Sequence, residues 1–126
     1  MARKKATTLT EAELRLMNVL WERGPSAVAE VVEALPEPLA YSTVLTTLRI
    51  LEQKGYIEHT KEGRAFLYQP IVDQAGARRN AVRHLVDHFF NKSPELLVLN
   101  VLKQEEFDHQ DLKRLKTLIE EGSQVE

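Results

Sequence analysis

Four polar side chains on one helix have the chemistry needed to read a DNA groove. A helix predicted to start near Ser42 places Ser42, Thr46 and Arg49 on one side, with Thr43 beside them. Hydroxyl groups both donate and accept hydrogen bonds, and a guanidinium can make paired bonds to a guanine edge. The spacing therefore predicts that Thr43, Thr46 and Arg49 reach base edges, while Ser42 caps the helix or binds a phosphate.

The other side of this helix indicates how such a surface is held in place. Val44, Leu48 and Leu51 recur at spacings of four and three residues, which is the pattern of one buried stripe. Gly55 is predicted to end the helix, because glycine readily takes the left-handed conformation at a helix end. The sequence thus predicts a polar reading face on a helix that is anchored by its apolar face.

A β-hairpin is predicted directly after that glycine. Residues 56–60 and 64–69 are predicted to be strands around a turn at residues 61–63, where Gly63 can adopt a positive φ. Phe66 and Tyr68 fall on one face of the second strand. Lys61 and Arg64 stand beside the turn and suit contact with phosphate, but a merely solvated turn explains these two residues equally well.

Two further helices are predicted before the reading helix. The first starts at a capping box formed by Thr10 and Glu13 and stops at residues 24–25. Ser26 is predicted to cap the second, and Pro36 ends it. The residues expected to face inward from the first helix are Leu14, Met17, Leu20 and Trp21. Three short helices followed by a hairpin are typical of a winged helix-turn-helix domain.

The residues after position 73 are predicted to form three more helices, which the chain is too small to enclose by itself. The middle one begins after Ser93 with the run LLVLNVL, which is apolar on nearly every side and must be covered. The simplest cover is the same segment of a second chain, which predicts a homodimer; a bundle folded back on its own domain is the alternative. The residues expected to form the dimer contact are Val86, Phe89, Leu96, Leu99, Leu102, Leu115 and Ile119.

The predicted fold class is therefore mainly α with a small β-hairpin. A winged helix-turn-helix DNA-binding domain is expected over residues 9–71, followed by a three-helix dimerisation region over residues 72–126. Residues 1–8 are predicted to be a flexible basic tail. Its Arg3, Lys4 and Lys5 can touch a phosphate backbone, although a solvated terminus is the favoured interpretation.

The charge of the chain is informative only when it is divided along the sequence. The formal net charge of the 126 residues is −2, but residues 41–83 carry a net of +3 and residues 84–126 a net of −4. Local charge governs phosphate contact, so the predicted reading region keeps the sign that DNA requires. The chain has no cysteine, no apolar run that would span a bilayer and no secretory signal, which predicts a cytoplasmic protein without membrane insertion.

Catalytic and metal-binding chemistry has little support in the sequence. No glycine-rich phosphate loop, zinc-protease helix or serine-elbow motif occurs. His84 and His88 lie one helical turn apart and could share a metal, but no third ligand lies near them in sequence. A surface histidine pair without metal is the favoured interpretation, and the sequence predicts neither an enzyme nor a cofactor.

The chain resembles the penicillinase and methicillin-resistance repressors, a winged-helix family of bacterial regulators. The matching segments are LTEAELRLMNVLW, YSTVLTTLRILEQKGYIEH, GRAFLYQP and SPELLVLNVLKQEEFD, which extend from about residue 9 to about residue 119. The resemblance implies a transcriptional repressor that acts as a homodimer. Each subunit would place its third helix in the major groove of one half of a dyad operator.

The same resemblance implies a way in which repression ends. In the antibiotic-resistance systems a membrane sensor protease, or a protease downstream of it, leads to a cut after an asparagine of the dimerisation helices, which corresponds here to the bond between Asn100 and Val101. The compared repressors have an aromatic residue where this chain has Val101, so a polar position in a dimer seam is the alternative interpretation of Asn100. For the whole chain, the alternative is a winged-helix module that binds a partner protein instead of specific DNA.

Overall fold

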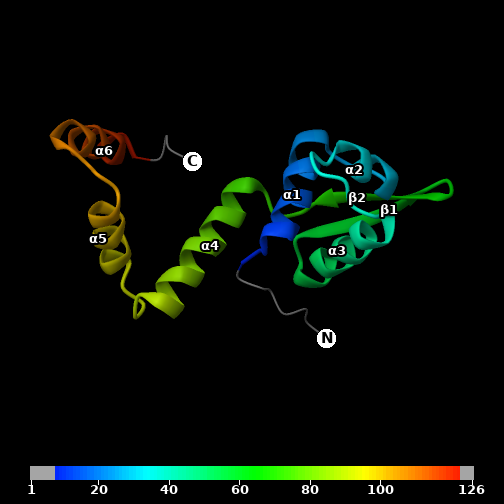
Figure 1. The fold of residues 1–126 in the computed structure, drawn as a ribbon, viewed down its shortest axis with the longest axis horizontal. Coiled ribbons are helices and arrows are strands. Elements are labelled where there is room, and N and C mark those ends of the chain that lie inside the picture. The colour runs from blue at the N-terminus through cyan, green and yellow to red at the C-terminus, as the bar shows by residue number, and fades with distance from the viewer. Residues whose placement is uncertain (1–7, 123–126) are drawn as a thin grey trace. The chain divides into compact units, whose positions relative to one another are not determined.

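The computed structural model describes residues 8–122, which form six helices and one two-stranded antiparallel hairpin (Figure 1). This confirms the fold class predicted from the sequence. The chain divides into two compact units, residues 1–81 and residues 82–126, so helix α4 contributes to both. The elements are α1 (Glu11–Arg23), α2 (Val28–Ala34), α3 (Tyr41–Lys54), β1 (Ile57–Glu62), β2 (Ala65–Pro70), α4 (Gln74–Phe89), α5 (Pro94–Gln104) and α6 (His109–Glu121).

One apolar core holds the first unit together. Helix α3 packs against α1 and α2, while β1 lies against α3 and β2 against α1. The predicted stripe of α3 is confirmed, because Val44, Leu48 and Leu51 are all fully buried. The other fully buried core side chains are Leu16, Met17, Leu20, Val31, Tyr56 and Ile57. Burial of one face of α3 leaves its opposite face on the surface of the unit.

The ends of the helices follow local signals in the sequence. Thr10 caps α1 in a reciprocal capping box with Glu13, as predicted. Gly55 ends α3 with a φ of +88°, in the left-handed region where glycine is favoured. The start of α3 differs from the prediction, since the helix begins at Tyr41 with Ala40 at its N-cap. Ser42 therefore lies in the first turn and is not the cap.

Two predictions about the first two helices are wrong. Leu14 is 41% exposed, because the stripe of α1 that meets the core is centred on Leu16 and Leu20. Ser26 does not cap α2, whose N-cap is Ala27. The backbone of Ser26 instead pairs with that of Tyr68, with N···O distances of 3.0 and 2.8 Å in the two directions. These two hydrogen bonds join the connection between α1 and α2 to the hairpin.

The hairpin is longer, and its turn is tighter, than the sequence predicted. The strands pair from Ile57 with Pro70 to Glu62 with Ala65, so only Gly63 and Arg64 remain in the turn. Gly63 has a φ of +62°, which explains the glycine at this position. As a consequence Lys61 belongs to β1 and only Arg64 lies at the tip. In Figure 1 the tip extends beyond helices α1, α2 and α3, which makes the hairpin a wing.

The second unit has well-formed helices but little core of its own. Helix α5 begins after Ser93, as the sequence predicted, and Ser93 caps it. Asp108 forms a capping box with Asp111 at the start of α6, and Gly122 follows the end of that helix. Neither α5 nor α6, both of which lie wholly in the described part of the chain, contains a buried residue. Among the helices of residues 8–122, none is long and apolar enough to cross a membrane.

Candidate nucleic-acid interface

The outward face of α3 carries the four polar residues that the sequence assigned to DNA. Ser42, Thr43, Thr46 and Arg49 are all exposed. They are held there because the opposite face of the same helix is fixed in the core. A helix about 10–12 Å wide with such a face fits the major groove of B-DNA. The structure therefore brings together on one rigid element the residues predicted to contact bases.

The two cations predicted at the wing are both exposed, but they occupy different places. Arg64 lies in the turn, whereas Lys61 lies within β1, opposite Phe66 on β2. Lys61 Nζ is 5.9 Å from the centroid of the Phe66 ring, a cation–π contact between the two strands of the hairpin. Of these two cations, Arg64 therefore lies nearer the tip of the wing.

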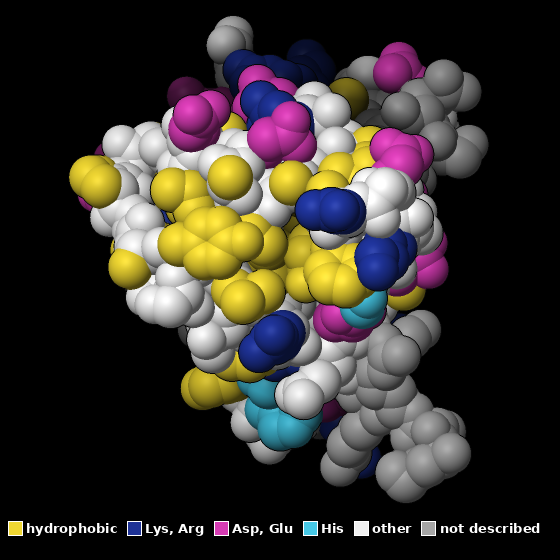
Figure 2. All heavy atoms as spheres, turned by 90° about the vertical axis from the view of Figure 1, so that its right-hand side faces the viewer, with side chains coloured by type: hydrophobic (Ala, Val, Ile, Leu, Met, Phe, Trp, Pro, Cys, Tyr) yellow, Lys and Arg dark blue, Asp and Glu magenta, His cyan; other side chains and the backbone are white. Residues whose placement is uncertain are grey.

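A groove of about 540 Å³ lies between the wing, α3 and the start of α2. Figure 2 shows the face toward which the hairpin extends in Figure 1: hydrophobic side chains gather near its centre, and Lys and Arg side chains lie beside them. The helices contribute Ala27, Val28, Ala29, Tyr41, Leu45, Arg49 and Glu52 to the lining of the groove. The wing contributes His59, Arg64, Ala65, Phe66 and Tyr68. Arg49 and Arg64 therefore line one groove.

One pair of residues in this groove was not predicted from the sequence. His59 Nδ1 lies 2.7 Å from Glu52 Oε2, which joins the wing to α3. The His59 ring packs edge-on against Phe66 at 5.1 Å between centroids, and it is tilted against Tyr68 at 5.4 Å. Strand alternation indicates from sequence alone that His59 and Lys61 share a face, but the contact with Glu52 depends on how the wing packs against α3.

The residues assigned to a dimer contact lie on the helices of the second unit. Val86 is already buried in the single chain, with 5% exposure, so it has little surface left to give to a partner. Phe89 and Ile119 are the most exposed, at 69% and 74%. The remaining residues of this set, exposed or half-buried, are Leu96, Leu99, Leu102 and Leu115. The dimer contact stays a prediction, for which these side chains offer an apolar surface.

The other residues that the sequence singled out are not among the described residues that line the groove. His84 and His88 stack with ring centroids 4.3 Å apart, and His88 Nδ1 is 3.0 Å from the backbone oxygen of His84. Within residues 8–122, no group of three or more metal-binding side chains occurs. Arg3, Lys4 and Lys5, which were considered for phosphate contact, lie outside the described residues.

Three packed helices, an exposed polar face on the third and a two-stranded wing define the winged helix-turn-helix class of DNA-binding domains. The chain belongs to the penicillinase repressor family, whose family model matches residues 9–121. The penicillinase repressor of Bacillus licheniformis is 30% identical over 120 residues, which are 94% of each chain. The methicillin resistance regulatory protein MecI of Staphylococcus aureus (strain N315) is 20% identical over 117 residues, which are 91% of this chain and 95% of that protein.

A solved structure matches part of the chain. It is the solution structure of the Bacillus licheniformis BlaI monomeric form in complex with the blaP half-operator, with 35% identity and a TM-score of 0.50. The match covers 58% of this chain and 92% of that one. The family that these proteins represent consists of bacterial transcriptional repressors and not of enzymes.

Proposed function

We propose that this protein is a transcriptional repressor that binds a dyad operator as a homodimer. The observation that carries the proposal is the exposed polar face of α3 beside a wing with two cations. Thr43, Thr46 and Arg49 contact base edges in the major groove, and Ser42 in the first turn binds a phosphate. Arg64 and Lys61 contact the DNA backbone from the wing. The complex of the B. licheniformis relative with a half-operator supports binding to operator DNA.

A gel-shift experiment tests the proposal and separates it from its alternative. The purified chain is mixed with a duplex from the region upstream of its own gene and with a scrambled duplex of equal length, at the same salt concentration. A repressor binds the upstream duplex much more tightly than the scrambled one. Equal weak binding to both, by a chain that is folded, would favour a winged-helix module that binds a partner protein.

Replacing Arg49 by alanine is expected to weaken binding to the upstream duplex more than binding to the scrambled duplex. The difference should be about 1–3 kcal/mol, the discrimination that a good base contact supplies. Competition binding on the two duplexes measures it. A loss of equal size on both would mean that Arg49 contacts only the phosphate backbone.

Arg64→Ala is the matched comparison, because it removes the same side chain from the wing. Its loss of affinity is expected to be similar on both duplexes, and the salt slope should fall by about one unit. An unchanged salt slope would contradict a phosphate contact by Arg64. The two variants together assign base reading to α3 and backbone binding to the wing.

The homodimer is proposed from the state of the second unit. Apolar side chains on α5 and α6 remain on the surface of the single chain, and neither helix has a buried residue. Exposed apolar patches of this kind are typical of obligate interfaces. A two-fold dimer would pair each such surface with its copy, and it would present two copies of α3 to the two halves of a dyad operator.

Inactivation by proteolysis between Asn100 and Val101 is the second part of the proposal. A membrane sensor protease, or a protease downstream of it, would be the partner, as the family resemblance implies. Both residues lie inside α5, where Asn100 Nδ2 donates to the backbone oxygen of Leu96 at 2.9 Å. Proteases bind extended chains, so the cut requires α5 to open locally.

Exposure of the source bacterium to a β-lactam is then expected to produce a fragment that ends at Asn100. Mass spectrometry of the chain recovered from treated and untreated cells measures the cut. Substituting Asn100 by glutamine serves as the matched variant, since it keeps the amide and lengthens the side chain by one methylene. Release of repression with the chain still intact would contradict proteolysis.

A further inference from the structure

The groove between α3 and the wing would lie against the DNA in the proposed complex, and its lining residues suit that position. With α3 in the major groove and the wing beside the adjacent minor groove, the sugar–phosphate strand between the two grooves must pass over this part of the surface. Arg49 and Arg64 both line the groove and give it the charge that a phosphate needs. His59, whose position in the sequence falls between those of the two arginines, lines the same groove.

The two nitrogens of the His59 ring have different surroundings. Nδ1 faces the Glu52 carboxylate at 2.7 Å, so Nδ1 carries a hydrogen and donates it, because a carboxylate accepts. The structure gives Nε2 no hydrogen-bond partner among residues 8–122. The His59 side chain is 38% exposed, which leaves part of the ring open to the groove. Nε2 is therefore the ring atom that is available to a ligand.

We infer that His59 binds a DNA phosphate through Nε2 while Glu52 holds Nδ1, and that DNA binding takes up one proton per subunit. In the neutral ring Nε2 has a lone pair, which repels a phosphate oxygen. A proton from the solvent converts Nε2 into a donor, and the resulting imidazolium lies between two anions, the phosphate and Glu52. The inference rests on the DNA-binding function proposed above and adds a contact and a proton linkage to it.

The other charged and titratable groups around His59 are consistent with this arrangement. Helix α3 presents Arg49, Glu52 and Tyr41 to the groove, while the wing presents Arg64 and Tyr68. Burial, followed by the negative charge of Glu52, raises the pKa of Tyr68, so its hydroxyl stays neutral. The start of α2 contributes only aliphatic side chains to the lining. Glu52 is thus the only anion of the described groove lining, and it faces Nδ1 rather than Nε2.

Calorimetry in two buffers tests the inference. The full chain is titrated with the upstream duplex and with a scrambled duplex, at about pH 7.5, in buffers of low and high ionisation enthalpy. If the ring of His59 takes up a proton on binding, the heats in the two buffers should differ by the equivalent of up to one proton per subunit. Because a phosphate contact does not depend on sequence, the same uptake is expected on both duplexes.

Two substitutions at His59 separate its chemistry from its packing. His59→Phe keeps a ring against Phe66 and Tyr68 but removes both nitrogens, and His59→Gln keeps a donor without a titrating group. Both should abolish the proton uptake, and His59→Phe should weaken binding about tenfold on both duplexes. Thermal unfolding of each variant establishes that the unit is folded. His109→Phe, at the start of α6, changes a histidine that is not among the groove-lining residues, and it is the matched control with unchanged uptake and affinity.

Glu52→Gln gives a result that a simple charge effect would not produce. Loss of an anion from the groove should by itself strengthen DNA binding, since like charges repel. If Glu52 acts through His59, its loss instead reduces the proton uptake without strengthening binding. Equal heats in both buffers, together with full affinity of His59→Phe, would overturn the inference while leaving DNA binding intact. A wild-type chain that binds neither duplex would overturn both this inference and the proposed function.

Discussion

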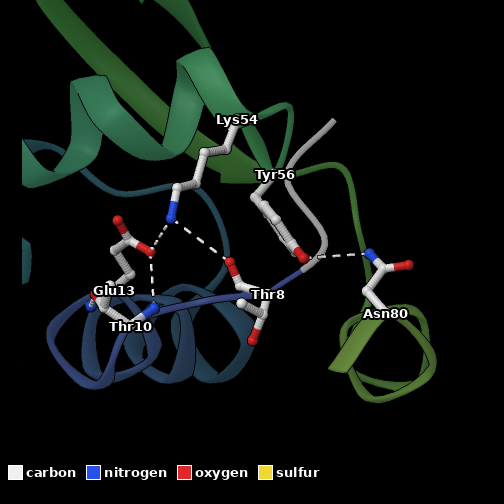
Figure 3. Close-up of polar contacts among 6 residues, drawn as sticks. All are labelled: Thr8, Thr10, Glu13, Lys54, Tyr56 and Asn80. Atoms are coloured by element: carbon white, nitrogen blue, oxygen red, sulfur yellow. Dashed lines mark hydrogen bonds and ion pairs between the residues drawn. The ribbon is translucent and has the colours of Figure 1, made fainter. Parts of the chain in front are cut away.

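Replacing Lys54 by methionine is expected to lower the free energy of unfolding by about 2–3 kcal/mol at neutral pH. Lys54 Nζ lies 2.6 Å from Glu13 Oε1, and it also donates to the backbone oxygen of Thr8 at 3.5 Å. These contacts join the end of α3 to the start of α1 (Figure 3). The Glu13 side chain is only 7% exposed, so loss of Lys54 leaves a nearly buried carboxylate without its cation. Lys54 is 24% exposed, which keeps the loss below that for a fully buried pair.

The effect of Lys54→Met should depend on pH in a direction that Glu13 determines. Burial raises the pKa of Glu13, but the hydrogen bonds from Lys54 and the Thr10 backbone, with the charge of Lys54, outweigh it and hold the pKa below its ordinary value. A carboxyl group with a lowered pKa stabilises the fold above its unfolded pKa of about 4.3, and this contribution is lost as the pH falls through the lowered value. The difference between wild type and variant should therefore be full at neutral pH and shrink in acid.

Urea unfolding at several pH values measures this difference. Arg15→Met is the matched control, because Arg15 pairs with Glu11 at 3.8 Å on the surface of α1. Its effect should stay below about 0.5 kcal/mol. In a double-mutant cycle, adding Glu13→Gln to Lys54→Met should recover part of the loss, since no buried charge remains. A loss for Lys54→Met that is equally large in acid would show that the lysine acts through packing alone.

Replacing Leu99 by glutamate is expected to convert the protein to a monomer and to lower its affinity for a full dyad site by about a hundredfold or more. Leu99 is 52% exposed on α5 in the single chain, so the substitution removes no contact of the core in the first unit. The new carboxylate would be buried in the dimer contact proposed above, where an unpaired charge is costly. Loss of the dimer removes the gain that comes from linking two half-site contacts.

Sedimentation measures the oligomeric state, and gel shifts on full-site and half-site duplexes measure the binding. The variant should bind a half-site like the wild-type chain, because α3 and the wing are unchanged. Gln104→Glu adds the same charge at the end of the same helix and is the matched control, which should remain dimeric. A Leu99→Glu variant that stays a dimer would place the interface elsewhere than on this face of α5.

The elements that the sequence predicted well are those with local signals. The capping box of Thr10 and Glu13, the serine before α5 and the glycine after α3 lie within a few residues of the helix ends that they fix. The stripe of α3 is equally local, because its spacing of three and four residues needs no knowledge of the partner helices. Since a helix with one buried face must expose the other, the polar reading face followed from the same pattern.

The incorrect details have a common cause in contacts between distant residues. Ser26 has the side chain of a good helix cap, but its backbone is hydrogen-bonded to that of Tyr68, which lies on the wing. The sequence places the wing turn too early, because both a three-residue and a two-residue turn can use Gly63. Only the pairing of the two strands distinguishes these turns. The sequence also assigns Leu14 wrongly to the inward face of α1. The reason is the same, because the residues that cover this face are distant from α1 in the sequence.

The sequence by itself determined the order of helices and strands, the anchoring stripe of α3 and the polar residues on its outward face. These depend on spacing and on capping, which act within a few residues. Only the tertiary structure decided that Arg49, Arg64, His59 and Glu52 line one groove, and that Lys54 meets Glu13 across 41 positions of the chain. The physical reason is that ion pairs and groove walls depend on the packing of separate elements, and side chains in a packed core fix that packing.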